Sequence, residues 1–216
     1  MVVGEETTTM KNLLVLALVV AAAACGGASR PTTATTAALA TVSDDALLDA
    51  MTARRAEAVE RLHAYRVAAV YPTDDAGLPL GVFRDARGVR CPMSELIYQS
   101  GRADLVDAVV RTDNALRLAE VHDGPLMAWM LESGLTKEEI VEIQGAMELD
   151  YTFLENVNDA NGEAGRSILV RAARQQVDDK LAAVEAKLAG QRTANLATVV
   201  ARLAAAERAG VVAQAK

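Results

Sequence analysis

The sequence predicts a mainly α-helical protein: a small helical domain with one short β-hairpin, followed by a C-terminal antiparallel helical hairpin. Two observations lead to this fold class. Aromatic residues make up only 3% of the 216 residues while alanine is abundant, a composition that suits thin packing between helices better than a thick β core. Apolar residues also recur at helical spacing through most of the chain after residue 43, between signals that begin and end helices.

The first clear pattern lies at residues 10–25, MKNLLVLALVVAAAAC. Lys11 precedes an unbroken apolar run and small residues follow it, which is typical of a secretory signal peptide. The run is too short to span a membrane, which takes roughly 20 apolar residues. We expect residues 1–24 to form the signal peptide. Met10 is the better start of translation, because residues 1–9 carry two glutamates and no cation.

The end of this segment, Ala22-Ala23-Ala24-Cys25-Gly26, resembles the lipobox of bacterial lipoproteins, although Ala22 stands where that family usually has leucine. The resemblance implies cleavage before Cys25 and attachment of acyl chains such as palmitate to Cys25, which would anchor the protein to a membrane. Gly26, in place of aspartate, implies the outer membrane, with the protein facing the periplasm. Cleavage without lipidation, giving a secreted or soluble periplasmic protein, is the alternative.

Residues 25–42 are rich in glycine, serine, threonine and alanine, and such a composition buries too little apolar surface to order itself. We expect a flexible tether that reaches roughly 20–25 Å on average. The domain would then lie just above the surface that holds the anchor.

The first helix is expected from Asp44 to Val70, with Ser43 as its cap and Pro72 ending it. His63 lies beside the apolar stripe and is interpreted as a partly exposed helix residue. The stripe consists of Leu48, Met51, Ala58, Leu62 and Tyr65.

Residues 71–81 are rich in turn-forming residues and predict a loop. At 82–91, two short runs with alternating apolar residues flank the sequence Asp-Ala-Arg-Gly, whose Gly88 tolerates a positive φ. This pattern predicts a β-hairpin. Pro92 suits the first position of a following helix, with Cys91 directly ahead of it.

Several shorter elements follow. Residues 103–111 and 125–132 have the spacing of buried helices, whereas 116–121 suits either a helix or a short strand. Thr136 with Glu139 three positions later forms a capping box, which marks the start of another helix.

After a polar break at residues 156–165, apolar stripes predict two helices at 168–188 and 196–206. An antiparallel pair is the simplest arrangement, and its alanine-rich core would need support from the domain, a partner or a second copy. We therefore divide the mature chain into a core domain at 43–155 and a helical hairpin at 162–214. The stripes consist of Val170, Val177, Leu181, Val184 and Leu188, and of Leu196, Val199, Val200 and Leu203.

Residues 63–144, with the blocks FRDARGVRCPMSELI and WMLESGLTKEEIVEIQ, resemble exported bacterial proteins of uncharacterised function. This resemblance implies an α-rich exported domain and no particular activity.

Cys91 is the sharpest chemical candidate. A cysteine at a helix N-terminus beside Arg90 would have its thiolate favoured by the helix dipole and the cation. His122 follows, and Asp123 or Asn114 could orient it. This order of cysteine and histidine resembles papain-like peptidases, including those that cut bacterial cell walls, although their flanking motifs are missing. The competing interpretation is a buried cysteine that packs the hairpin against the helix.

No metal or cofactor site is predicted. Cys91, His63 and His122 are too far apart in sequence for a zinc signature. Residues 158–163 hint at a calcium loop, but Val157 and Ile168 fall where oxygen ligands are required.

Nucleic-acid binding is not expected, because the formal net charge is −7 and phosphate binding needs clustered cations. Residues 127–147 have helix-turn-helix spacing, yet the second helix opens with Glu138 and Glu139, which phosphate would repel.

The expected function is therefore that of a non-enzymatic binding or scaffold lipoprotein of the cell envelope. Its partner would be the membrane through the anchor, together with an envelope protein or a second copy bound through the C-terminal helices. The alternative is a cysteine-dependent envelope hydrolase that uses Cys91 and His122.

Overall fold

The computed structural model describes residues 44–152 and 163–208. The predicted signal peptide, Cys25, the predicted tether, Ser43 and most of the calcium-like segment lie outside the described residues. Contacts within the chain divide it into a unit at 1–40 and a unit at 41–216, and every described residue belongs to the second.

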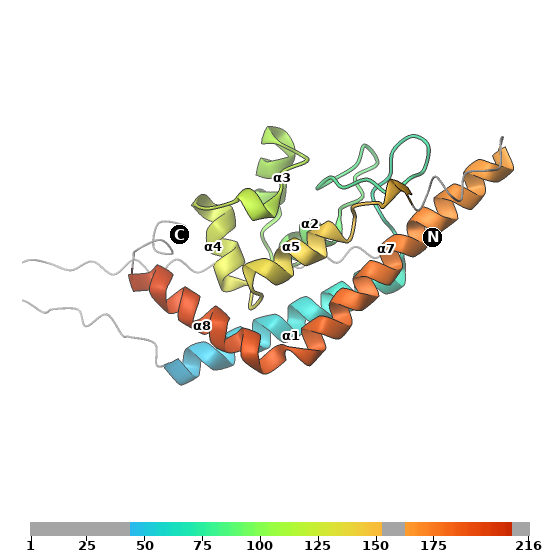
Figure 1. Cartoon of the computed structure of the whole chain (residues 1–216). Helices are drawn as coiled ribbons and strands as arrows, with labels where there is room; N and C mark the ends of the chain where they lie inside the picture. Colours follow the sequence, from blue (N-terminus) through green and yellow to red (C-terminus); the bar gives the residue numbers. More distant parts are fainter. Residues whose placement is uncertain (1–43, 153–162, 209–216) are drawn as a thin grey trace, which may run out of the picture. The chain divides into compact units, whose positions relative to one another are not determined.

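The second unit is mainly helical, as the sequence predicts (Figure 1). Each helix predicted from the sequence is present over its central residues. The ambiguous segment at 116–121 contains a short 3₁₀ helix. The elements are α1 (Asp44–Ala68), α2 (Pro92–Gln99), α3 (Ala103–Thr112), η1 (Leu118–Glu120), α4 (Gly124–Glu132), α5 (Lys137–Gly145), α7 (Glu163–Gly190) and α8 (Arg192–Arg208). None of the described helices is long and apolar enough to cross a membrane.

Helix α1 is the element on which α2, α7 and α8 all pack. Its buried stripe differs from the predicted one at a single turn, because Leu47 is buried while Leu48 is 41% exposed. The main core gathers apolar side chains from every helix except α8, and a smaller cluster joins α8 to the start of α1. This smaller cluster consists of Leu47, Met51, Leu196, Val199 and Leu203.

The predicted β-hairpin at 82–91 is not present. Only an isolated bridge between Arg84 and Arg90 forms. Phe83 N, which would donate to Cys91 O in a longer hairpin, donates instead to the backbone carbonyl of Asn114 at 2.8 Å. The Asn114 side chain bonds N and O of Arg84 at 3.0 and 2.8 Å, on the edge of the segment that faces away from Arg90. The pairing therefore ends after a single bridge.

The segment between α1 and α2 is built from the same turn used twice. Asp85 accepts hydrogen bonds from the backbone N–H groups of Arg87 and Val89, both at 2.9 Å. Asp74 does the same for residues 76 and 78, again at 2.9 Å. A glycine with positive φ follows each aspartate at the third position. In each turn the aspartate carboxylate accepts from backbone N–H groups that a sheet would otherwise pair. The turn therefore forms without a neighbouring strand.

The antiparallel pairing predicted for the C-terminal helices is not confirmed. Helices α7 and α8 meet at a bend, and each packs against α1 (Figure 1). Their predicted apolar stripes are nevertheless the residues that become buried, including Val177, Leu181 and Val199. The support that this alanine-rich pair requires therefore comes from the domain itself.

A buried ion pair connects these elements. Arg55 of α1 and Glu139 of α5 are each 2% exposed, and the guanidinium donates to both carboxylate oxygens at 2.7 and 2.6 Å. Arg55 also donates to the carbonyl oxygens of Gly134 at 3.3 Å and Leu188 at 3.0 Å. Glu139 accepts further bonds from Asn195 Nδ2 at 2.7 Å and from Thr136 N at 2.8 Å within the predicted capping box.

Gly134 allows α1 to pack closely against the turn between α4 and α5. Gly134 has φ of +79°, and a Cβ atom there would lie 2.5 Å from Arg55 N and 2.7 Å from Met51 O. Only glycine accommodates both the left-handed backbone and the approach of α1. The turn between α4 and α5 can therefore present its carbonyl to Arg55.

Burial by itself would raise the pKa of Glu139, but the hydrogen bonds from Arg55, Thr136 and Asn195 outweigh it and hold the pKa below its usual value. A carboxyl group whose pKa is lowered by folding stabilises the folded state above its unfolded pKa. That contribution disappears as the pH falls through the folded pKa.

Replacing Glu139 with glutamine is expected to lower the free energy of unfolding by about 3–5 kcal/mol, because the substitution leaves Arg55 buried without a counter-charge. The stability of the wild-type chain should also fall below about pH 4, near the unfolded pKa of glutamate, while that of Glu139→Gln should depend less on pH in this range. Urea unfolding monitored by circular dichroism at several pH values measures both effects.

Glu138→Gln is the matched control. Glu138 neighbours Glu139 on α5 but forms an exposed pair with Arg202, at 3.1 Å. An exposed pair contributes at most about 1 kcal/mol, so Glu138→Gln should be nearly neutral at pH 7. Equal losses from the two substitutions would contradict the central role given to the buried pair.

Candidate functional site

Cys91 is the N-cap residue of α2, as predicted, and it lies in the core with 2% of its surface exposed. Its Sγ accepts a hydrogen bond from Ser94 N at 3.5 Å. Burial raises the pKa of the Cys91 thiol to about 11, against the opposing effect of nearby backbone N–H groups. At neutral pH the group is therefore a neutral thiol, which is a poor nucleophile.

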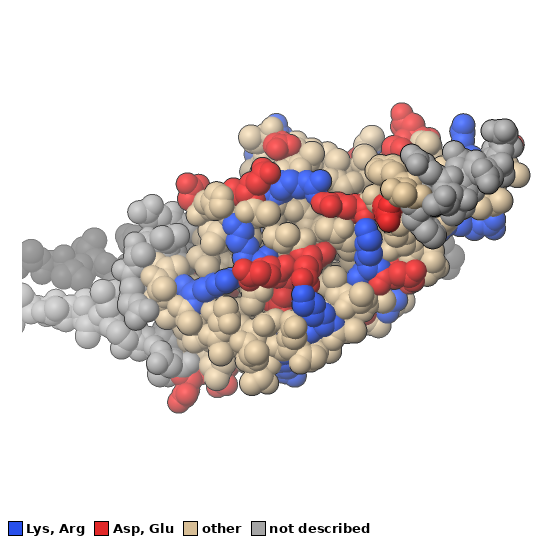
Figure 2. Space-filling view, viewed as in Figure 1, with Lys and Arg blue, Asp and Glu red and all other residues tan. Residues whose placement is uncertain are grey.

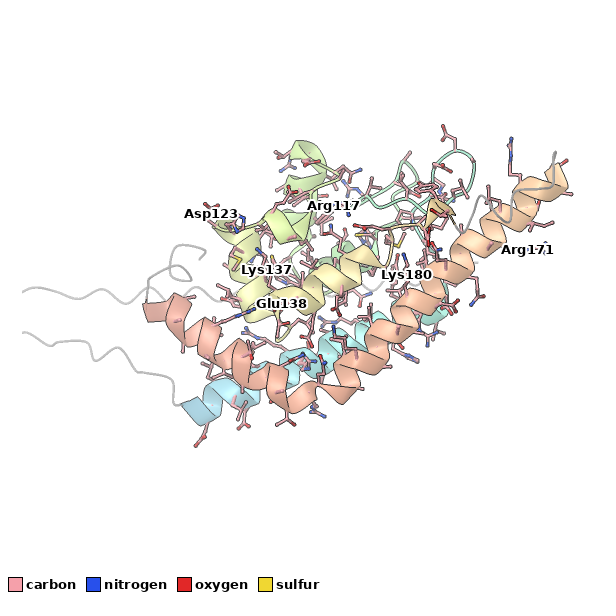
Figure 3. The ribbon with its side chains drawn as sticks, viewed as in Figure 1. Arg117, Asp123, Lys137, Glu138, Arg171 and Lys180 are labelled. Carbon is pink, nitrogen blue, oxygen red and sulfur yellow. The ribbon has the colours of Figure 1, made fainter. Side chains whose placement is uncertain are left out.

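His122 and Asp123 lie on the surface between η1 and α4. Asp123 occupies the N-cap position of α4 but makes no capping bond with its side chain, and Figure 3 shows it at the outer edge of that helix. Among the described residues, no hydrogen bond joins Cys91 to His122. Asn114, the alternative partner for orienting His122, bonds Arg84 instead.

A buried thiol with a raised pKa should resist alkylation. We expect Cys91 in the native protein at pH 7.5 to react with iodoacetamide at least a hundredfold more slowly than in the urea-unfolded protein, measured by mass spectrometry of the Cys91 peptide. Rapid labelling of the native protein, with a rate that rises around a pKa below 7, would contradict the buried assignment and favour a thiol enzyme.

The two histidines of the chain lie apart from any metal-like grouping. His63 is exposed on α1 and its Nδ1 is 3.3 Å from Glu185 Oε2 of α7. In the part of the chain that the structure describes, no group of three or more His, Cys, Asp or Glu side chains could hold a metal ion.

The charged groups on the face shown in Figure 2 are largely paired with one another. Acidic side chains of α5 and of the segment after it meet cations from neighbouring elements: Glu138 with Arg202, Glu142 with Lys187, and Glu148 with Arg117. Lys137, labelled in Figure 3, donates to the carbonyl of Val121 at 2.7 Å. These contacts link α5 and the segment after it to η1, α7 and α8. The charged residues of this face are therefore best explained as stabilising the packing of these helices.

A hollow of about 270 Å³ lies where α1, α2 and α4 meet. We call it the arginine hollow, because its lining includes two arginines of α1 and Arg102, which directly precedes α3. Its lining residues are Arg54, Glu57, Ala58, Arg61, Leu96, Ser100, Arg102, Trp129, Glu132, Ser133 and Leu135.

The floor of the arginine hollow is apolar and buried. Leu96, Trp129 and Leu135 are 2%, 7% and 3% exposed, and all three belong to the main core. The polar groups beside them are already satisfied: Trp129 Nε1 donates to Ser100 Oγ at 2.8 Å, and that hydroxyl donates to Ile97 O at 2.7 Å. The floor can therefore offer a ligand shape and apolar contact rather than free hydrogen-bond donors.

The rim carries the charge. Arg54 donates to Glu132 O at 2.9 Å while its guanidinium is 3.9 Å from the Glu132 carboxylate. Arg61 makes a single bond, at 3.0 Å, to Glu57. A guanidinium group has five N–H donors. The guanidinium groups of Arg54 and Arg61 therefore keep donors that have no partner among the described residues.

Arg102 is more fully engaged than the other two. It donates to both oxygens of Asp104 at 3.0 Å, and this hydrogen bonding raises the pKa of Arg102 above its usual value. The two arginines of α1 are therefore the principal donors that a ligand would meet.

This site was not predicted from the sequence. Residues 54, 57, 58 and 61 of α1 share one helical face, a spacing that is readable in the sequence, but charged residues on an exposed helix are most often solvated. The arrangement becomes a site only because α2 and α4, far away in sequence, place Leu96 and Trp129 beneath it.

Comparisons with known protein families, curated proteins and solved structures found no match for this chain.

Proposed function

We propose that this protein is a non-enzymatic binding lipoprotein of the cell envelope, and that it uses the arginine hollow to bind an anionic group of an envelope partner. The binding part of this proposal rests on the arginine hollow. Its guanidinium groups lie above a buried apolar floor, and guanidinium groups are well suited to bind carboxylates and phosphates. The lipobox-like sequence at Cys25 supports the envelope part.

Three observations support a binding role over the hydrolase. Burial raises the pKa of Cys91, His122 makes no hydrogen bond to it, and the described residues hold no metal-like cluster. The arginine hollow has donors and an apolar floor but contains no cysteine or histidine and no other activated nucleophile. Such a lining suits recognition rather than bond cleavage.

The partner surface is better placed at the arginine hollow than on the C-terminal helices. The apolar stripes of α7 and α8 are covered by α1 and the rest of the domain, so little apolar area remains on them for self-association. Binding at the hollow needs no rearrangement of these helices.

The anchor is tested by the intact mass of protein extracted from bacterial membranes with detergent. We expect the mass of a chain that begins at Cys25 plus diacylglycerol and one N-linked acyl chain. A Cys25→Ser variant should leave the membrane fraction or retain its signal peptide. A chain cut near residue 24 without acyl groups would overturn the anchor in favour of a soluble exported protein.

Binding at the hollow is tested by site-specific photo-crosslinking in cells. A benzoylphenylalanine at position 57, on the rim, should give a discrete adduct, and Arg61→Met in the same chain should reduce that adduct at least fivefold. The same probe at position 56, on the solvent side of α1, is the matched control. Equal adducts from both positions, or no effect of Arg61→Met, would contradict a role for the hollow.

A further inference from the structure

The charges around the arginine hollow limit the kind of anion it accepts. The charge of Arg102 is neutralised by Asp104, so a ligand meets Arg54 and Arg61 together with Glu57 and Glu132. These four charges balance, and a doubly charged phosphate would leave excess negative charge beside the two glutamates. A group with a single negative charge, accompanied by hydrogen-bond donors, fits this lining better.

The two glutamates also give the hollow acceptors. Glu57 uses one carboxylate oxygen for Arg61, and the Glu132 carboxylate makes only the long contact of 3.9 Å with Arg54. A ligand that brings N–H groups beside its carboxylate would satisfy both kinds of rim residue. Peptides combine these groups, because each residue adds a backbone N–H.

The size and floor of the hollow restrict the peptide further. About 270 Å³ lies below the roughly 300–1,000 Å³ of sites that enclose whole small ligands, so only one or two residues fit. Leu96, Trp129 and Leu135 are almost fully buried, so the apolar surface that they expose under the charged rim is small and suits a single side chain. At a peptide C-terminus, the carboxylate and an apolar side chain leave the same Cα, and the chain exits in one direction only.

An internal aspartate fits less well. Its carboxylate is the side chain itself, so no apolar group from the same residue would reach the floor, and the main chain would have to leave the hollow at both ends. On the basis of the binding function proposed above, we infer that the arginine hollow takes the free C-terminal carboxylate of a peptide whose last side chain is apolar.

The chain contains one tryptophan, and because Trp129 forms part of the floor, its fluorescence reports binding directly. The probes are acetyl-Ala-Leu as the free acid, the same peptide as its C-terminal amide, acetyl-Leu-Asp-amide with only a side-chain carboxylate, and inorganic phosphate. Titration into the full mature protein should shift the Trp129 emission with the free acid. The amide, the aspartyl peptide and phosphate should each bind at least tenfold more weakly.

Arg54→Met and Arg61→Met should each weaken binding of the free acid at least tenfold. Methionine keeps an apolar stem of similar length but removes the donors. Arg111→Met is the matched control, since Arg111 is exposed on α3 outside the hollow, and it should leave the affinity unchanged. Unchanged melting temperatures show that the variants are folded.

Equal affinity for the amide or for the aspartyl peptide overturns the inference of a chain terminus, and equal affinity for phosphate overturns the inference of a carboxylate. If no peptide binds while the photo-adduct from position 57 persists, this inference falls and the proposed binding function stands. If both the titration and the adduct are absent, both fall.

Discussion

The contact between Arg55 and Glu139 is the interaction on which the rest of the domain depends. Removing two charges from water costs several kcal/mol for each ion, and their attraction compensates only with good geometry and further hydrogen bonds. Here the geometry is bidentate and both groups have additional partners from the turn at Gly134, the end of α7 and the start of α8. Few alternative packings of these helices would satisfy all of those bonds, so the pair specifies the arrangement more than it adds to stability.

The same pair sets the rotation of α1, and through it the shape of the arginine hollow. With Arg55 directed at α5, the neighbouring face of α1 carrying Arg54, Ala58 and Arg61 is turned toward α2 and α4. Trp129 belongs to α4, and Gly134, which contacts Arg55, lies in the turn that directly follows this helix. A contact that orients helices therefore also places the apolar floor beneath the charged rim.

Sequence reasoning found the helices of this protein because their signals are local. The capping box at Thr136, the proline that starts α2 and the apolar stripes of α7 and α8 act within a few turns of chain. The hairpin at 82–91 was wrong for a non-local reason: the backbone carbonyl of Asn114, some thirty residues away, accepts from Phe83 N, which would otherwise extend the pairing. The buried role of Arg55 was equally hidden, since a lone arginine on a helix gives no sign of a carboxylate that comes more than eighty residues later. The arginine hollow needs three separate segments and could not be predicted from any one of them.

The position of Leu188 and Asn195 has a practical consequence. Their carbonyl and amide groups reach the ion pair from α7 and α8, which begin at Glu163 and Arg192. The polar residues just before Glu163 are the natural place to end a shorter version of the protein. A fragment ending there would lose both contacts and uncover the side of α1 that α7 and α8 shield. The last two helices are therefore an integral part of the packing around α1.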